Sequence, residues 1–268
     1  MDAPWLRRVS DRVAPTLIQV IKRVPPLHAV AITIRAWVRW NIFRPKQERR
    51  EMSSWRRAGS PVPPPDSFKQ TVVRNYGRRF HLRTFIETGT YLGDMVEAQR
   101  RHHRRVLSIE LASALCRDAT IRFAKARNVT ILEGDSGELL PGILVGIEEP
   151  CLFWLDGHYS AGVTARGTLE TPILQELETI FTHPHEHVIL VDDARCFGAG
   201  DYPTLDVLRE MTASRRPDWA IEVEDDIIRI HRSVARRRDP VASGVVARPG
   251  PEPLPGRGHD VRTRQPFP

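Results

Sequence analysis

Short apolar runs alternate with longer amphipathic stretches between residues 84 and 191. Five short runs are candidate buried strands: 84–87, 105–110, 129–133, 151–155 and 187–191. Helix-like stretches separate them at 94–103, 112–126 and 169–182, with a short turn near 136–144. Continuous apolar strands separated by helices predict a parallel sheet that helices cover on both faces.

The pattern changes after residue 191. Trp219 to Val223 and Ile227 to His231 are two β-rich runs joined by three acidic residues, which predicts a hairpin. The expected fold class is α/β, with a mostly parallel seven-stranded sheet that ends in this antiparallel hairpin. A plain dinucleotide-binding fold would end on a sixth parallel strand instead.

The two ends of the chain differ from this centre. Residues 1–60 are predicted to form a basic helical extension, in which Pro15 is placed to open a short first helix. The run P-V-P-P-P at 61–65 predicts a stiff linker. The folded domain is expected at 66–236, and the Pro- and Arg-rich residues 237–268 are expected to be a disordered tail.

Charge is distributed unevenly along the chain, whose net charge is +7. Residues 1–60 carry 13 Lys and Arg against 4 Asp and Glu, and residues 232–268 carry 8 Arg against 3 acids. The central part is therefore acidic, with a net charge of −7. Because the basic residues lie in the flanks, we expect no nucleic-acid groove in the folded core.

The segment 27–43 is strongly apolar but contains Arg35 and Arg39 on one helical face. Its length and its charges make it a poor membrane span. Two interpretations stay open: the segment packs onto the domain, a partner or a second copy, or it lies on a membrane surface. Three unpaired cysteines and the missing secretion signal predict a reduced, cytoplasmic protein, with peripheral membrane association as an option.

The most informative motif follows the first predicted strand. Glu87 and Thr88 lead into a turn with glycines at Gly89 and Gly93, after which a helix is expected. Such a turn presents backbone N–H groups and a helix N-terminus to a ligand. The spacing E-x-G-x-x-x-G lacks the third glycine of the dinucleotide motif, so no pyrophosphate needs to be bound. It suits S-adenosylmethionine, which offers a carboxylate, an amine and a ribose.

Polar residues also follow every other predicted strand. Ligands of such sheets bind beyond the carboxyl ends of the strands, which places these residues together. A single acid at a strand end is explained as a helix N-cap, but acids at all five ends are not. Glu110 is placed to accept hydrogen bonds from both ribose hydroxyls. Further along the chain lie Asp135 and Ser136 at the expected adenine edge, then Asp156, and then the pair Asp192 and Asp193.

Residues 85–202 resemble class I S-adenosylmethionine-dependent methyltransferases. Within that class they are similar to metal-dependent sugar O-methyltransferases of the macrocin type, and more distantly to catechol O-methyltransferase. The resemblance implies a Rossmann-like sandwich, with the cofactor held by the turn residues, Glu110 and Asp156. It also implies a Mg²⁺ ion bound by Asp156, Asp192 and Asp193. The chain departs from the sugar enzymes in Thr90-Tyr91-Leu92 within the turn and in Gly-His-Tyr-Ser after Asp156.

Physical arguments stand beside the resemblance. Three carboxylates at neighbouring strand ends repel one another unless a cation offsets them, and oxygen ligands suit Mg²⁺. His158 lies two residues after Asp156 and is the candidate general base, although it is equally placed to hydrogen-bond within its loop. The histidines of H-P-H-E-H at 183–187 alternate around a proline, which favours an exposed loop over a metal site.

The sequence thus predicts methyl transfer from S-adenosylmethionine to a hydroxyl of a small molecule or sugar, with Mg²⁺ assisting. A non-catalytic module that binds the same cofactor is the first alternative. A nicotinamide-dependent oxidoreductase is the second, and it is disfavoured by the missing glycine and the terminal hairpin.

Overall fold

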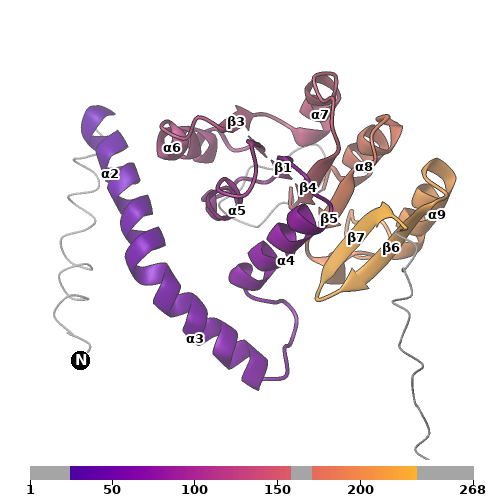
Figure 1. The fold of residues 1–268 in the computed structure, drawn as a ribbon, viewed down its shortest axis with the longest axis horizontal. Coiled ribbons are helices and arrows are strands. Elements are labelled where there is room, and N and C mark those ends of the chain that lie inside the picture. Colours follow the sequence, from indigo (N-terminus) through magenta and orange to yellow (C-terminus); the bar gives the residue numbers. More distant parts are fainter. Residues whose placement is uncertain (1–24, 158–170, 234–268) are drawn as a thin grey trace, which may run out of the picture. The chain divides into compact units, whose positions relative to one another are not determined.

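A seven-stranded sheet forms the centre of the computed structural model, which describes residues 25–157 and 171–233 (Figure 1). These residues belong to one unit that ends at Ser233. The strands lie in the order β3-β2-β1-β4-β5-β7-β6. Their bounds are β1 Thr84–Thr88, β2 Arg105–Glu110, β3 Val129–Glu133, β4 Cys151–Leu155, β5 Val188–Val191, β6 Trp219–Glu224 and β7 Ile227–Arg232.

The pairing of the strands confirms the predicted fold class. β1 to β5 run parallel, while β7 pairs antiparallel with β5 and β6 pairs antiparallel with β7. β1 lies between β2 and β4, so the chain reverses its direction of strand addition beside β1. Ligand sites of parallel sheets lie at such a reversal, beyond the carboxyl ends of the strands.

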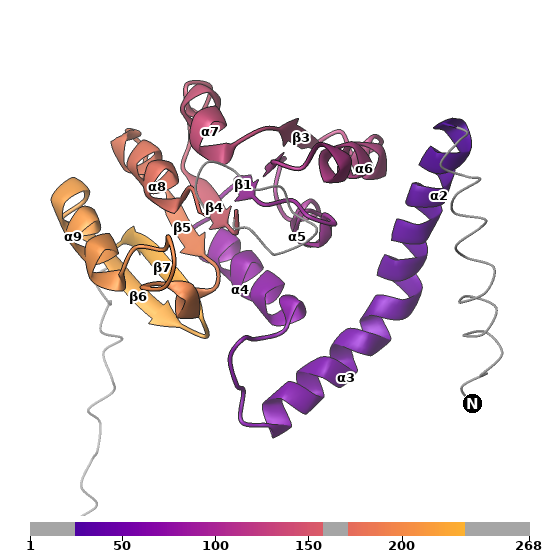
Figure 2. The ribbon, with the colours of Figure 1, turned by 180° about the vertical axis from the view of Figure 1, so that it is seen from behind.

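Two apolar cores lie on the two faces of the sheet. Successive residues of a strand point to opposite faces, so Phe85 joins one core and Ile86 joins the other. Figures 1 and 2 show α4, α5 and α6 on the face of the first core and α7, α8 and α9 on the face of the second. The strands β1, β4 and β5 are buried on both faces, which explains the continuous apolar sequences of β4 and β5.

The helices of the domain follow the predicted alternation, with differences. They are α4 Asp66–Arg79, α5 Asp94–Gln99, α6 Ser113–Phe123, α7 Ser136–Leu144, α8 Ile173–Thr182 and α9 Leu205–Arg215, with a 3-10 turn η2 at Ala194–Cys196. The helix expected at 94–103 ends at Gln99. The start expected for α8, at residue 169, lies outside the described residues, and α4 and α9 were not predicted.

The N-terminal residues that the structure describes are helical. α2 (Pro25–Val38), a π-helical turn η1 (Arg39–Phe43) and α3 (Arg44–Arg57) follow one another without a break. The short helix expected around Pro15 and the expected tail at 237–268 lie outside the described residues. No helix in the part of the chain that the structure describes is long and apolar enough to cross a membrane.

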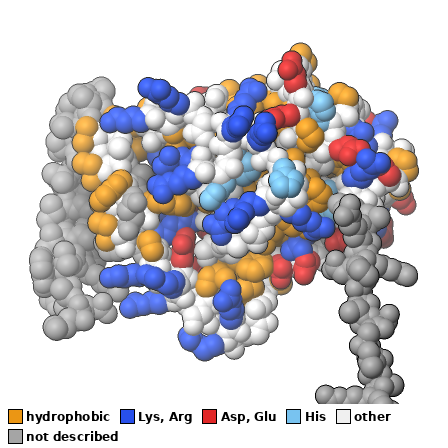
Figure 3. All heavy atoms as spheres, in the orientation of Figure 1, with side chains coloured by type: hydrophobic (Ala, Val, Ile, Leu, Met, Phe, Trp, Pro, Cys, Tyr) orange, Lys and Arg blue, Asp and Glu red, His pale blue; other side chains and the backbone are white. Residues whose placement is uncertain are grey.

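A groove of about 720 Å³ lies between α3 and the helices α4 and α5. Lys and Arg side chains project over much of the molecular face drawn in Figure 3. The arginines that line the groove are Arg49, Arg56, Arg57, Arg74 and Arg101. Part of the basic charge of the N-terminal flank is therefore set against the folded domain.

Candidate functional site

The acids at the ends of β1, β2, β4 and β5 are brought to one edge of the sheet. Backbone hydrogen bonds continue the pairing of β1 with β4 and of β4 with β5 past the strand ends. The Asp156 N–H donates to the Thr88 carbonyl at 3.1 Å. In the same way the Asp192 N–H donates to the Leu155 carbonyl at 3.0 Å. The sequence-predicted residues Glu87, Glu110, Asp156 and Asp192 are thus neighbours at the carboxyl edge.

The glycine turn requires its two glycines. Gly89 has a φ of +86°, and a Cβ on it would lie 2.4 Å from the carbonyl oxygen of Asp156. Gly93 has a φ of +74°, and its Cβ would lie 2.7 Å from the ring of Phe123. The first glycine therefore lets the turn approach the end of β4, and the second lets it pack on α6.

The N–H groups of the turn are used differently from the expectation. Gly89 donates to the carbonyl of Ile109 at 2.9 Å and Thr90 donates to the same oxygen at 3.3 Å. Tyr91 donates to a carboxylate oxygen of Glu110 at 2.7 Å. These three N–H groups, which were expected to be free for a ligand, hold the turn on the end of β2 instead.

Glu110 joins the turn to the start of α6. Its Oε2 accepts from Tyr91 N and its Oε1 accepts from Ala112 N at 2.8 Å, and only 4% of the residue is exposed. Each carboxylate oxygen has a second lone pair. The carboxylate is therefore fixed in orientation and still able to accept hydrogen bonds from a ligand.

Glu87 lies in a buried hydrogen-bonded row. Ser108 Oγ donates to Glu87, so Thr90 Oγ1, which lies 2.6 Å from Ser108 Oγ, donates in turn to Ser108. Burial raises the pKa of Glu87 well above its usual value, and the charges of Asp156, Glu110 and Asp94 raise it further. A carboxyl group in this environment gains from a cationic ligand. Thr90, one of the departures from the sugar enzymes, has a structural role here.

The end of β3 differs from the other strand ends. Asp135 caps α7 and accepts from the Gly137 N–H at 2.8 Å, which is the ordinary role of an acid in this position. Ser136 Oγ donates to Glu176 of α8 at 2.5 Å. The adenine contacts expected for Asp135 and Ser136 stay predictions, and the hydroxyl hydrogen of Ser136 is already engaged.

Glu176 is a buried acid that the sequence reasoning missed. It is 1% exposed, and burial raises its pKa to about 7, while the hydrogen bond from Ser136 opposes the shift. Its spacing from Ile173, Leu177 and Ile180 places it on the apolar face of α8. An acid within an apolar helical stripe is the signal that identifies it.

The acid pair at the end of β5 contacts a lysine from α4. Lys69 Nζ donates to Asp192 Oδ2 at 2.7 Å and to Asp193 Oδ1 at 3.3 Å, and Lys69 is 9% exposed. Burial by itself lowers the pKa of Lys69, but Asp192, Asp193 and Asp156 raise it overall. Burial and the Asp156 charge raise the pKa of Asp192, against the effect of Lys69. The lysine therefore carries its charge at neutral pH.

A second cation completes the neutralisation of this pair. Arg195 Nη1 donates to Asp193 Oδ1 at 2.8 Å and also bonds Asp226 in the turn between β6 and β7. The backbone of Asp193 is left-handed, with a φ of +55°. The hairpin is in this way tied to the site, because Ala194 N also donates to the Asp226 carbonyl at 2.9 Å.

The arrangement does not fit the Mg²⁺ site that the resemblance implies. The carboxylates of Asp192 and Asp193 are directed at the ammonium of Lys69. Among residues 25–157 and 171–233, no group of three or more His, Cys, Asp or Glu side chains is arranged to hold a metal ion. Asp156 remains close enough for its charge to shift the pKa of Asp192 and of Lys69. His158, the candidate base, lies outside the described residues.

The histidines at 183–187 lie in a loop, as expected, but the loop is exposed only in part. His187 is 1% exposed, and its Nδ1 accepts from the Cys151 N–H at 2.9 Å. Its Nε2 therefore donates to His183 Nδ1 at 2.8 Å, and His183 Nε2 donates to the Leu144 carbonyl at 3.1 Å. This chain of hydrogen bonds uses the ring nitrogens of both residues, so the cluster is structural.

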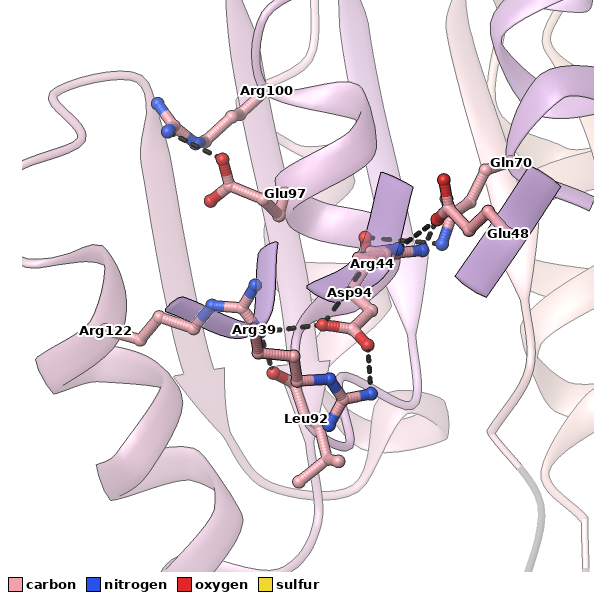
Figure 4. Close-up of polar contacts among 9 residues, drawn as sticks. All are labelled: Arg39, Arg44, Glu48, Gln70, Leu92, Asp94, Glu97, Arg100 and Arg122. Atoms are coloured by element: carbon pink, nitrogen blue, oxygen red, sulfur yellow. Dashed lines mark hydrogen bonds and ion pairs between the residues drawn. The ribbon is translucent and has the colours of Figure 1, made fainter. Parts of the chain in front are cut away.

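The N-terminal helices contact the glycine turn through Asp94, the first residue of α5 (Figure 4). Arg39 of η1 lies 2.5 Å from Asp94 Oδ2, and Arg122 of α6 lies 3.0 Å from Oδ1. Arg44 of α3 lies 3.7 Å from Oδ1 and donates to Gln70 Oε1 at 2.7 Å. Three guanidinium groups from three helices thus surround the carboxylate that follows Gly93.

No family model and no curated protein matches the sequence. Solved structures that are similar to this chain include the O-methyltransferase TomG from Streptomyces achromogenes in complex with SAM. It is 18% identical over 69% of this chain and 87% of that chain, with a TM-score of 0.45.

A putative O-methyltransferase from Klebsiella pneumoniae is 15% identical over 75% of this chain and 96% of that chain, with a TM-score of 0.48. An O-methyltransferase from Bacillus cereus in complex with SAH is 14% identical over 74% and 96%, with a TM-score of 0.46. Because these likenesses are distant, we base the proposed function on the residues at the strand ends.

Proposed function

We propose that this chain is a methyltransferase that uses S-adenosylmethionine and methylates a hydroxyl of a small molecule or sugar. The observation that carries the proposal is the set of buried carboxyl groups at adjacent strand ends, beside a turn that only glycine permits. A protein that only needed the fold would gain nothing from these groups, because burying them costs free energy. Their cost is offset when a ligand of positive charge and several hydroxyls binds between them.

Two of these acids suit two parts of the cofactor. Glu87 has a raised pKa because it is buried among carboxylates, so the ammonium of the methionine part would stabilise its charged form. Glu110 is held by two backbone N–H groups and keeps lone pairs for both ribose hydroxyls. The roles of Thr88, Gly89, Gly93, Asp135, Ser136 and Asp156 as further cofactor contacts stay part of the proposal.

The reaction is a displacement at the methyl carbon. S-adenosylmethionine, held by Glu87, Glu110 and the glycine turn, would supply the methyl group: the acceptor oxygen would bond to the methyl carbon while the sulfur–carbon bond breaks, which would leave a neutral thioether. The hydroxyl proton leaves to a base, for which Asp156 and His158 are the candidates. The protein contributes by aligning oxygen, carbon and sulfur, since alignment supplies much of the rate of such a transfer.

Magnesium is not given a step in this proposal. It was expected from the resemblance, but the ammonium of Lys69 contacts the carboxylate oxygens of Asp192 and Asp193 to which a divalent ion would bind. Residues 27–43 are proposed to dock onto the chain's own domain, and the contact between Arg39 and Asp94 supports this. Self-association or membrane-surface binding through the same segment, and a cytoplasmic location, remain proposals that no contact described here supports.

Glu110 provides the first test. We expect the full-length protein to bind S-adenosylmethionine in a calorimetric titration, and Glu110→Ala to bind it roughly 100-fold more weakly, because two charge-assisted hydrogen bonds are lost. Glu110→Gln keeps one acceptor oxygen and should fall between the two. Circular dichroism confirms that each variant is folded.

Glu133→Ala is the matched control for this test. Glu133 is the register partner of Glu110 on β3, and it is exposed. Its removal should leave cofactor affinity unchanged. The proposal fails if the wild-type protein binds no S-adenosylmethionine, or if it binds NADH in its place.

A further inference from the structure

Lys69 reaches the acid pair from an element that lies outside the methyltransferase-like region. It comes from α4 and contacts residues that follow it by 123 and 124 positions. The position of Lys69 is fixed by its helix: Lys69, Val73, Tyr76 and Gly77 recur at helical spacing and are all buried. Lys69 therefore belongs to the packed face of α4.

α4 is held firmly beside the site. The neighbouring side chain of Gln70 accepts from Arg44 at 2.7 Å, and the Gln70 carbonyl accepts from the Gln99 side chain at 2.9 Å. Both glutamines are buried. The packed face of α4 and the two hydrogen bonds of Gln70 thus fix the helix from which Lys69 reaches the acid pair.

The carboxylate oxygens of the pair are already engaged in large part. Asp192 Oδ2 accepts from Lys69, and Asp192 Oδ1 accepts from the Asp193 N–H at 2.8 Å. Asp193 Oδ1 accepts from both Lys69 and Arg195. A divalent ion needs several oxygens directed at one point, and here the oxygens are directed at an ammonium and a guanidinium.

We propose that the ammonium of Lys69 is the built-in cation of the Asp156, Asp192 and Asp193 cluster and stands in for a divalent metal ion. This inference deepens the proposed function, and the part that it gives Lys69 in the reaction rests on that function. One buried positive charge offsets the repulsion among the carboxylates, as a metal ion would. In the proposed reaction the acceptor oxygen approaches an ammonium, whose charge stabilises that oxygen as its proton leaves.

Manganese binding tests this inference directly, because Mn²⁺ substitutes for Mg²⁺ and its free form is seen by electron paramagnetic resonance. We expect the wild-type protein to show no tight Mn²⁺ site. Lys69→Met removes the ammonium and leaves the three carboxylates with Arg195 as the remaining cation in contact with Asp193, so it should bind one Mn²⁺ roughly 100-fold more tightly than wild type. Lys69→Arg keeps the charge and should behave as the wild type does.

A double variant, Lys69→Met with Asp192→Asn, should lose the gained affinity. The inference is overturned if wild type binds one Mn²⁺ tightly and Asp192→Asn abolishes this binding. It is also overturned if folded Lys69→Met binds Mn²⁺ no better than wild type. Should Lys69→Met not fold, Lys69→Gln provides the same comparison.

A cofactor titration of the wild-type protein in EDTA, run beside the manganese experiment, separates the two proposals. Cofactor binding without a metal site supports both. If no cofactor binds but Lys69→Met gains the manganese site, the methyltransferase proposal fails and the assignment of Lys69 stands. If the cofactor binds and the wild-type protein binds manganese through Asp192, the methyltransferase proposal stands and the assignment of Lys69 fails.

Discussion

At the scale of single residues, Gly89 holds the end of β1 against the end of β4. Its left-handed φ of +86° is costly for any other residue, and its missing side chain makes room for the Asp156 carbonyl. Packing against a backbone atom offers no flexible neighbour that can move aside. The position is therefore fixed both by conformation and by space.

Replacing this glycine tests that dependence. We expect Gly89→Ala to lower the free energy of unfolding by about 1–3 kcal/mol, because alanine is strained at a left-handed φ and its Cβ would clash with the Asp156 carbonyl oxygen. We also expect the variant to lose cofactor binding. Urea denaturation and calorimetry measure the two effects. Gly142→Ala is the control: nothing lies within 4 Å of its added Cβ, and as a helical glycine it should gain about 0.5–1 kcal/mol. Equal stability of Gly89→Ala and wild type would contradict the close approach.

The residues of the site were predictable in part. Glu87, Glu110, Asp156 and Asp192 were placed together because the carboxyl ends of parallel strands meet at one edge. Lys69 was not, because a lysine in a helix far upstream carries no motif. Its position four residues before the buried Val73 is the signal that would have found it.

At the scale of elements, the N-terminal helices and the glycine turn are connected. Arg44 is 9% exposed and links α3 to Gln70 of α4 and to Asp94 of α5. Because this buried guanidinium contacts three elements, we expect a displacement of α3 to shift Asp94 at the start of α5. The described N-terminal helices are therefore linked to the turn through Arg44.

The change Arg44→Met keeps much of the volume and removes the charge. We expect about 1–3 kcal/mol of destabilisation, since Gln70 and Asp94 lose a buried partner. Hydrogen exchange should become faster at 25–57 and at 89–94. Lys46→Met, an exposed change on the same helix, should leave both regions unaffected. Unchanged exchange at 89–94 in Arg44→Met would show that the helices and the turn are independent.

The elements themselves were predicted unevenly, for a physical reason. β1, β2, β4 and β5 are buried along nearly their whole length, while β3 at the edge is only half-buried, and apolar runs bounded by polar residues mark these strands. α4 presents buried polar residues, Lys69 and Gln70, within its packed face, and these weaken the apolar pattern of Phe68, Val72, Val73 and Tyr76. Tertiary contacts that satisfy the polar groups are not visible in the sequence.

At the scale of the whole molecule, buried histidine couples stability to pH. Burial lowers the pKa of His187 to about 3, and the charges of its neighbours contribute. The folded protein thus keeps His187 neutral over a range in which the unfolded chain takes up a proton. Its contribution is complete above about pH 6.5, the ordinary pKa of histidine, and is lost progressively as the pH falls from there toward 3.

Urea denaturation at several pH values checks this. Between pH 6.5 and 4.5 we expect His187 to account for a fall of up to about 1.4 kcal/mol per pH unit in the free energy of unfolding. His187→Gln should be less stable near pH 7.5, because the Cys151 N–H is left with a poorer partner, but its pH dependence should be shallower. His81→Asn, at an exposed left-handed position, should keep the wild-type slope. Parallel curves for wild type and His187→Gln would refute the buried neutral histidine.

The lysine in α4 has a consequence for sorting other proteins of this architecture. In the proposed assignment, a single residue in the helix ahead of the first strand supplies the positive charge that the acids at the carboxyl edge of the sheet contact. Chains with a neutral side chain at the equivalent position are expected to depend on dissolved metal, and chains with lysine to tolerate chelators. The identity of this one residue, which lies outside the recognised motifs, would then predict whether a protein of this architecture keeps its activity in the presence of a chelator.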